Sequence, residues 1–128
     1  MLDGVAAHAR GTAPDECCGF LLGTDAEIVD TVRSANLADD PTRRFLIDPK
    51  THFETRRRAA ERGLAIVGFY HSHPASEPVP SASDLVGATY PDQWYLIVRP
   101  LPSNCQARLF GLDRAGFVEI ELKVDSDP

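Results

Sequence analysis

Apolar and polar residues are spaced along the chain in a way that predicts three helices. Apolar residues recur at helical spacing over residues 2–10, and a glycine follows, which is typical of a short amphipathic helix. Asp48 can cap the N-terminus of the next helix, and Pro49 suits its first turn, where a missing N–H costs nothing. Residues 49–62 are therefore expected to be helical, and a third helix is expected over residues 81–90.

Short apolar or alternating runs predict a sheet. Residues 18–22 and 64–70 are almost wholly apolar, which is typical of strands that are buried on both faces. The remaining expected strands are residues 28–32, 45–47, 94–98, 105–110 and 117–122. The last three are joined by short links, which favour antiparallel pairing. These elements predict an α/β or α+β sandwich, a mixed sheet flanked by helices, in a single domain over residues 1–128.

The net charge narrows the range of partners. The chain of 128 residues carries a formal net charge of −6, whereas nucleic acids and anionic membranes bind clustered positive charge. No apolar window reaches the length of a membrane span, and the first residues lack the pattern of a signal peptide. We therefore expect a cytoplasmic protein whose main partner is neither nucleic acid nor membrane. The three cysteines lack metal-binding spacing and are expected to be small buried apolar residues.

The candidate chemistry lies directly after the predicted strand over residues 64–70. His71 and His73 alternate along an extended segment, so that their imidazoles point to the same side. Asp84 follows in the first turn of the third predicted helix. Two imidazoles and one carboxylate are a ligand set that catalytic zinc uses when a fourth position is left to water. The pattern therefore predicts zinc ligands at these three positions.

Other interpretations of the same residues compete with a metal site. Ser81 and Asp84 have the spacing of a helix cap, in which Ser81 merely accepts a backbone N–H. A serine hydrolase would need Ser81 in a Gly-x-Ser-x-Gly turn, which is missing, and it would leave the paired histidines unexplained. A zinc nucleoside deaminase needs a Pro-Cys-x-x-Cys pair, which is also missing. The coincidence of His-x-His with Ser-x-x-Asp favours the metal site.

Several motifs together resemble one known family. They are Pro14-Asp15-Glu16-Cys17-Cys18-Gly19, Gly68-Phe69-Tyr70-His71-Ser72-His73-Pro74, Pro80-Ser81-Ala82-Ser83-Asp84, and Asn36 with Phe45-Leu46-Ile47-Asp48-Pro49. With a glutamate, His-x-His and a following Ser-x-x-Asp, the chain resembles the JAMM (JAB1/MPN/Mov34) metalloproteases, most of all their short, stand-alone prokaryotic branch. The resemblance covers nearly the whole chain and implies a mixed sheet flanked by helices, of the cytidine-deaminase-like kind.

The resemblance implies a role for each motif residue. His71, His73 and Asp84 would bind zinc. Glu16 would hold the metal-bound water and act as general base, and Ser81 would stabilise the oxyanion. The implied substrate is the amide bond after the C-terminal Gly-Gly tail of a small ubiquitin-like or sulfur-carrier protein, joined to cysteine or another amine. A non-catalytic scaffold of the same fold is the alternative.

Three further expectations concern specificity and surface. The stretch between Asp84 and Trp94 is too short for the long insertion with which ubiquitin-chain-cleaving members recognise a second ubiquitin, which argues against polyubiquitin specificity. The arginine run at 56–58 is expected to be a solvated helix face rather than a docking patch. His52 is expected to be a surface or packing residue rather than a ligand.

Overall fold

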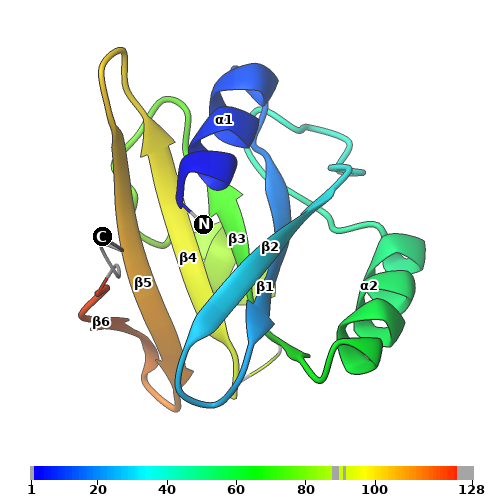
Figure 1. The fold of residues 1–128 in the computed structure, drawn as a ribbon. Coiled ribbons are helices and arrows are strands. Elements are labelled where there is room, and N and C mark those ends of the chain that lie inside the picture. Colours follow the sequence, from blue (N-terminus) through cyan, green and yellow to red (C-terminus); the bar gives the residue numbers. More distant parts are fainter. Residues whose placement is uncertain (1, 88–89, 91, 124–128) are drawn as a thin grey trace.

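A mixed six-stranded sheet lies at the centre of the structure, with the strand order β2-β1-β3-β4-β5-β6 (Figure 1). The computed structural model describes residues 2–87, 90 and 92–123. The strands are β1 (Cys18–Gly23), β2 (Ile28–Ser34), β3 (Ala65–Ser72), β4 (Trp94–Pro100), β5 (Cys105–Asp113) and β6 (Gly116–Ile120). The helices are α1 (Leu2–Thr12), α2 (Pro49–Glu61) and α3 (Ala82–Gly87). The expected mixed sheet flanked by helices is confirmed.

Strand direction follows from the connections between the strands. β3 and β4 are parallel, because the chain crosses over through α3 between them, and the other neighbouring strands pair antiparallel. The short turns that join β4 to β5 and β5 to β6 give the antiparallel pairs that their length predicted. In this strand order, β1 has a hydrogen-bonded neighbour on both sides, and β3 lies in the middle of the sheet.

The sheet separates two apolar cores. Alternate residues of a strand point to opposite faces, and α1 covers one face while α2 covers the other. The buried residues on the α1 face are Val5, Ala9, Cys17, Leu21, Tyr70, Leu96, Val98 and Leu109. Those on the α2 face are Phe20, Leu22, Ala59, Phe69, Tyr95, Ile97 and Phe110. Because Phe69 belongs to the α2 face, His71, two residues further along β3, points to that face as well.

β3 extends beyond its predicted end at Tyr70 and runs to Ser72. The amide of Ser72 donates to the carbonyl oxygen of Cys17 at 3.1 Å, and the pairing of β3 with β4 continues to the same point. His71 therefore lies inside the strand, opposite Cys18 on one side and Ile97 on the other. Hydrogen-bonded neighbours on both sides hold its backbone in place.

Two further predicted elements differ from the structure. Residues 45–47 do not form a strand, and only an isolated bridge joins Asn36 to Ile47. One backbone hydrogen bond, from the Leu37 amide to the Leu46 carbonyl at 2.8 Å, forms this bridge, and the side chain of Asn36 makes further bonds to the backbone of residues 44 and 46. The third helix is described over Ala82–Gly87, and both predicted end residues, Ser81 and Tyr90, lie outside it. The predicted residues 88 and 89 lie outside the described residues.

The first two helices agree with the sequence pattern. α1 and α2 begin where predicted and end within two residues of the predicted position. The Asp48 carboxylate accepts the amide of Lys50 at 3.0 Å, so that it caps α2 as its position indicated. In the part of the chain that the structure describes, no helix is long and apolar enough to cross a membrane.

We expect a methyl group at Gly68 to disrupt the parallel pair that supports the histidines. A Cβ at Gly68 would overlap the carbonyl oxygen of Trp94 on β4, so Gly68→Ala should lower the free energy of unfolding by about 2 kcal/mol or more. Gly4→Ala is the matched control, because a Cβ at this helical position has nothing within 4 Å and should stabilise the protein by up to about 1 kcal/mol. Urea unfolding measures both, and equal effects of the two changes would contradict the close packing of β3 on β4.

Candidate functional site

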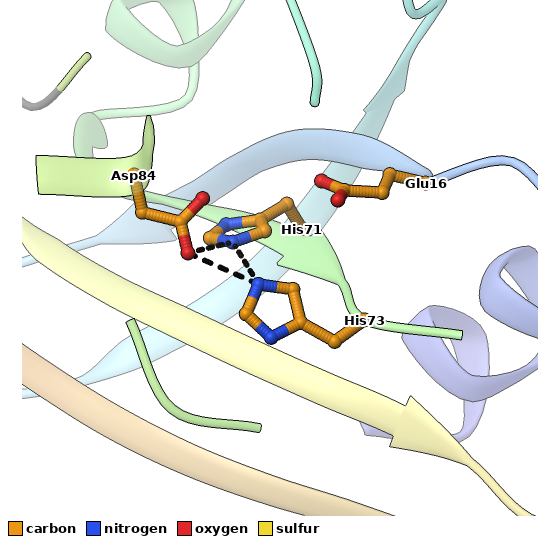
Figure 2. Close-up of side chains that lie close together, drawn as sticks. All are labelled: Glu16, His71, His73 and Asp84. Atoms are coloured by element: carbon orange, nitrogen blue, oxygen red, sulfur yellow. Dashed lines mark hydrogen bonds and ion pairs between the residues drawn. The ribbon is translucent and has the colours of Figure 1, made fainter. Parts of the chain in front are cut away.

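Four polar side chains converge at one end of the sheet (Figure 2). His71 comes from the end of β3, His73 from just past it, Asp84 from α3, and Glu16 from the residue pair before β1. One ligand atom of each lies within 4.8 Å of the others. All four side chains are buried, with Glu16 and His73 each 5% exposed. The structure thus brings together Glu16, both histidines and the aspartate, which the sequence analysis had singled out.

Three of these groups form a tight triangle. The Nε2 atoms of His71 and His73 are 3.2 Å apart, and Oδ2 of Asp84 lies 3.1 Å from the first and 3.0 Å from the second. Nδ1 of His73 lies 2.9 Å from the carbonyl oxygen of Glu77, so this nitrogen carries a proton that it donates. In a neutral ring the Nε2 atom of His73 then presents a lone pair toward the Asp84 carboxylate. Such an arrangement requires a proton or a cation among the three atoms.

Burial and hydrogen bonding shift the ionisation of the triangle. Burial lowers the pKa of His71, although contact with Asp84 partly offsets it. Burial also acts to lower the pKa of His73, but the hydrogen bonds to Asp84 and to the Glu77 carbonyl outweigh it and raise the pKa. For Asp84, burial is outweighed by the hydrogen bonds from both rings, which hold its pKa far below its ordinary value. Asp84 is therefore a carboxylate, and its negative charge attracts positive charge to the triangle.

Glu16 is the one member of the group without a hydrogen-bond partner at its carboxylate tip. Its Oε1 atom is buried and unpartnered, and an unsatisfied buried oxygen of this kind calls for an explanation such as an ion or water. Burial raises the pKa of Glu16 to about 7, with the charge on His73 opposing the rise and the charge on Asp84 adding to it. The free lone pairs and the neighbouring triangle together fit a bound cation.

The backbone around Glu16 is held from two sides. The Glu16 amide donates to the carbonyl oxygen of Pro41 at 2.7 Å, and the Glu16 carbonyl accepts from the side chain of Asn36 at 3.0 Å. The next amide, that of Cys17, donates to the hydroxyl of Ser72 at 2.8 Å. Ser72 lies between the two histidines in the sequence. Its contacts with Cys17 therefore link the backbone beside Glu16 to the backbone beside His71 and His73. No pattern in the single chain predicted these contacts.

Asn36 and Phe45 are further residues of the site that residue patterns alone did not identify. The Asn36 amide donates to the carbonyls of Glu16 and Arg44, and its oxygen accepts from the amides of Ala38 and Leu46, all at 3.0 Å. This organises the segment that brings the Phe45 ring onto His71, with the ring centroids 4.4 Å apart and an interplanar angle of 22°. The only signal was their presence in the motifs that carry the family resemblance.

Ser81 lies beside the triangle and caps α3. Its hydroxyl oxygen accepts the amide of Asp84 at 3.0 Å, and its own amide donates to Oδ2 of Asp84 at 2.8 Å. The capping contact that the sequence offered as an alternative is therefore present. Since the oxygen acts there as acceptor, the hydroxyl hydrogen remains available to a further acceptor. Among the described residues, the hydroxyl makes no hydrogen bond to either histidine of the site.

An apolar cleft leads to the site on the α2 face of the sheet. Its volume is about 380 Å³, and Asp84 lies in its wall. The apolar part of the wall consists of Phe45, Leu46, Ile47, Pro49, Phe69, Tyr90 and Tyr95. His52 also lines the cleft and packs against Phe20 and Phe69, which agrees with the packing role expected for it. The cleft offers an extended apolar surface next to the polar cluster.

The cysteines take no part in the cluster. Cys17 and Cys18 are free and fully buried, and burial raises their pKa values to about 11 and about 12. They are therefore neutral thiols at physiological pH, which confirms the expectation of small buried residues for this pair. Cys105 is only half-buried, so the expectation of a buried residue is wrong for this cysteine. The arginines at positions 56–58 are exposed on α2, as expected for a solvated face.

Comparison with known proteins adds a family to this geometry. The family described as prokaryotic homologs of the JAB domain matches residues 1–110. A protein of Haloferax volcanii named desampylase is 39% identical, over 77% of this chain and 75% of that protein. A protein of Mycobacterium tuberculosis named CysO-cysteine peptidase is 32% identical, over 77% of this chain and 68% of that protein.

Solved structures share the fold. A protein of Desulfitobacterium hafniense has a TM-score of 0.88 at 28% identity, and the match covers 98% of this chain and 89% of that one. A protein of Archaeoglobus fulgidus, described as a JAB1/MPN domain protein, has a TM-score of 0.64 at 23% identity, with coverage of 95% and 91%. The six-stranded sheet with its helices is therefore a JAB1/MPN fold.

We expect the stability of the metal-free protein to report the ionisation of Glu16. Because the pKa of Glu16 is raised to about 7 in the folded protein and is about 4.3 in an unfolded chain, the folded state binds this proton more tightly. That contribution is complete below about pH 4 and is lost as the pH rises through 7. Glu16→Gln lacks this titrating group. Between about pH 5 and pH 8, its free energy of unfolding should therefore rise by about 2 kcal/mol relative to that of the wild type.

Urea unfolding in the presence of a chelator, repeated across this pH range, measures the difference. Glu61→Gln, at an exposed position on α2, is the control and should follow the wild type. Parallel pH profiles for the wild type and Glu16→Gln would contradict the burial of an unpaired carboxyl group.

Proposed function

The chain belongs to the family of prokaryotic homologs of the JAB domain, and from this premise we propose that it is a zinc-dependent peptidase that releases a small carrier protein from its conjugates. The bond hydrolysed is the amide after the C-terminal glycine of the carrier. The names of its relatives, desampylase and CysO-cysteine peptidase, support cleavage of small-protein conjugates. The observation that carries the proposal is the convergence of four ligand-bearing side chains, Glu16, His71, His73 and Asp84.

The spacing of the triangle supports zinc as the cation. Tetrahedral zinc with bonds of about 2.0–2.1 Å keeps its ligand atoms roughly 3.3 Å apart. The corresponding distances among His71, His73 and Asp84 are 3.0, 3.1 and 3.2 Å. The three side chains would hold the ion, and their lone pairs, which otherwise face one another, would point to it. The Nδ1 bond of His73 to the Glu77 carbonyl leaves Nε2 as the ligand atom.

Glu16 is proposed as the general base. When bound, zinc supplies Lewis acidity, which lowers the pKa of a water molecule to about 7 and polarises a carbonyl oxygen. The Glu16 carboxylate takes a proton from the attacking water as the C–O bond forms, and its unpartnered Oε1 atom is available to do so. As the C–N bond breaks, Glu16 gives that proton to the departing amine. The oxygen of the water thus ends in the carboxylate of the carrier, and the transferred proton ends on the amine.

Ser81 is proposed to stabilise the oxyanion. Its hydroxyl oxygen is held by the Asp84 amide at 3.0 Å, which limits the rotation of the side chain. The hydroxyl hydrogen can then be donated to the carbonyl oxygen while negative charge develops on it. One residue would therefore serve both as the cap of α3 and as a donor in the transition state. The two interpretations of Ser81 are compatible in this proposal.

The proposed substrate is a small ubiquitin-like or sulfur-carrier protein with a C-terminal Gly-Gly tail, joined to cysteine or another amine. A glycine tail has no side chains to exclude it from a cleft, so it can lie extended against the wall formed by Phe45 and Tyr95 and reach Asp84. The two named relatives support a protein conjugate rather than a free peptide as substrate. A non-catalytic scaffold is disfavoured, because a buried unpaired carboxylate at Glu16 is costly and serves no purpose in binding alone.

We expect Glu16→Gln to keep zinc and to lose turnover. The zinc-loaded protein is incubated with a carrier whose Gly-Gly tail is joined to cysteine, and the products are weighed by mass spectrometry. Without the base, kcat should fall about 10²–10⁴-fold, while metal analysis should give the zinc content of the wild type. His71→Ala, in contrast, should lose both. Wild-type turnover by Glu16→Gln would refute the base assignment, and a conjugate left intact by the zinc-bound wild type would refute the substrate class.

A second change separates the two roles of Ser81. Ser81→Ala should lower kcat about 10²–10³-fold, with little change in KM, because the donor acts in the transition state. It should also lower the free energy of unfolding by about 1 kcal/mol through loss of the cap. Ser81→Thr keeps both the hydroxyl and the cap and serves as the control. A loss of stability with unchanged kcat in Ser81→Ala would assign Ser81 to the cap alone.

A further inference from the structure

Arg99 lies on β4 next to the residue that holds the backbone of His73. The amide of His73 donates to the carbonyl oxygen of Val98 at 2.8 Å. Nη1 of Arg99, the next residue, donates to Oε1 of Glu77 at 3.1 Å. The carbonyl oxygen of Glu77 accepts in turn from Nδ1 of His73 at 2.9 Å. These contacts form a closed ring from the backbone of His73, through β4 and Glu77, to its imidazole.

We propose that the ion pair between Arg99 and Glu77 is a positioning device, which holds the Glu77 carbonyl against His73 and so keeps the imidazole aimed at the metal. This inference rests on the proposed zinc site and adds two positioning residues to it. Among the described residues, neither side chain makes a hydrogen bond or ion pair to Glu16, His71 or Asp84. Arg99 and Glu77 act through His73 alone.

The segment that carries Glu77 is held by the buried Pro78 and by individual hydrogen bonds rather than by regular structure. Residues 74–80 contain neither helix nor strand, and Ala75, Ser76 and Glu77 are exposed. The Glu77 carbonyl accepts a second hydrogen bond, from the amide of Val79 at 2.8 Å, so both lone pairs of this oxygen are used. Movement of Glu77 would therefore break the bond to His73 and the turn at Val79 together.

The environment of Arg99 sets this ion pair apart from an ordinary surface pair. The Arg99 side chain is only 28% exposed, whereas the Glu77 side chain is 65% exposed. The Nε atom of Arg99 is buried with no hydrogen-bond partner, which costs free energy. The guanidinium is thus kept partly out of water on the β4 side, while its outer nitrogen reaches the loop. One partner of the ion pair thus lies in a strand of the sheet and the other in a segment without regular structure.

Removing each partner of the ion pair in turn distinguishes a positioning role from an effect of charge alone on zinc binding. If only the long-range field mattered, loss of the positive charge in Arg99→Gln would strengthen zinc binding, and loss of the negative charge in Glu77→Gln would weaken it. If the pair positions His73, both changes weaken it. The exchanged pair, Arg99→Glu with Glu77→Arg, keeps the net charge and can restore the contact. The direction of the Arg99→Gln effect is therefore decisive.

Zinc affinity and amide exchange together test the proposal. Dissociation constants for zinc are measured by chelator competition in the full chain, and exchange of the Val79 amide is measured in metal-free protein. Arg99→Gln and Glu77→Gln should each weaken zinc binding about tenfold, at the lower end of the range for residues that orient a ligand, and should speed exchange at Val79. The exchanged pair should recover most of the zinc affinity and most of the protection of the Val79 amide from exchange.

Arg62→Gln is the control for loss of an arginine ion pair, because Arg62 pairs with Asp30 at 2.8 Å in a more exposed setting. That pair joins the end of α2 to β2, away from the histidines, and its loss should change neither measurement. Unchanged or tighter zinc binding by Arg99→Gln, or unchanged exchange at Val79, would overturn the proposal. Because neither measurement uses turnover, a protein that binds zinc yet cleaves no conjugate would refute the proposed activity without affecting this comparison.

Discussion

The hydrogen-bonded pairing of β1 with β3 is the constraint on which the candidate site depends. It places Cys18 opposite His71 and joins Cys17 to Ser72 by two further hydrogen bonds. In an antiparallel pair the start of one strand lies beside the end of the other, which is why Glu16 meets the histidines. A shift of register by one residue would turn His71 to the opposite face of the sheet. The pattern that specifies the two apolar cores therefore also specifies the site.

Burial has opposite consequences for the two carboxyl groups of the cluster. Asp84 is buried against two imidazoles, whose hydrogen bonds keep it ionised. Glu16 is buried without a partner at Oε1, and its pKa rises to about 7. One group is thus suited to hold positive charge and the other to exchange a proton near neutral pH. The difference arises from a few contacts, since both carboxyl groups lie in the same small cluster.

The local part of the site could be predicted from the sequence, whereas the contacts between distant segments could not. His71, His73 and Asp84 belong to one short stretch whose spacing encodes their convergence. Glu16 was accessible only through family resemblance, because no residue pattern states that β1 pairs with β3. The contacts of Asn36 and the stacking of Phe45 on His71 depend on how their segment folds back. The wrong strand at 45–47 has the same cause, since this segment pairs with the backbone near Asn36 at a single bridge and is otherwise held by the Asn36 side chain.

The connection from β3 to β4 carries much of the candidate site. His73, Glu77, Ser81 and Asp84 all lie in it, and none of them belongs to either apolar core. Part of the chemistry is therefore encoded outside the apolar framework, while His71 on β3 and Glu16 before β1 tie it to the sheet. A protein of this fold could have a different connection at this point and retain all six strands. It could then have a different reaction or none. Divergence by exchange of a single connection is thus available to this architecture.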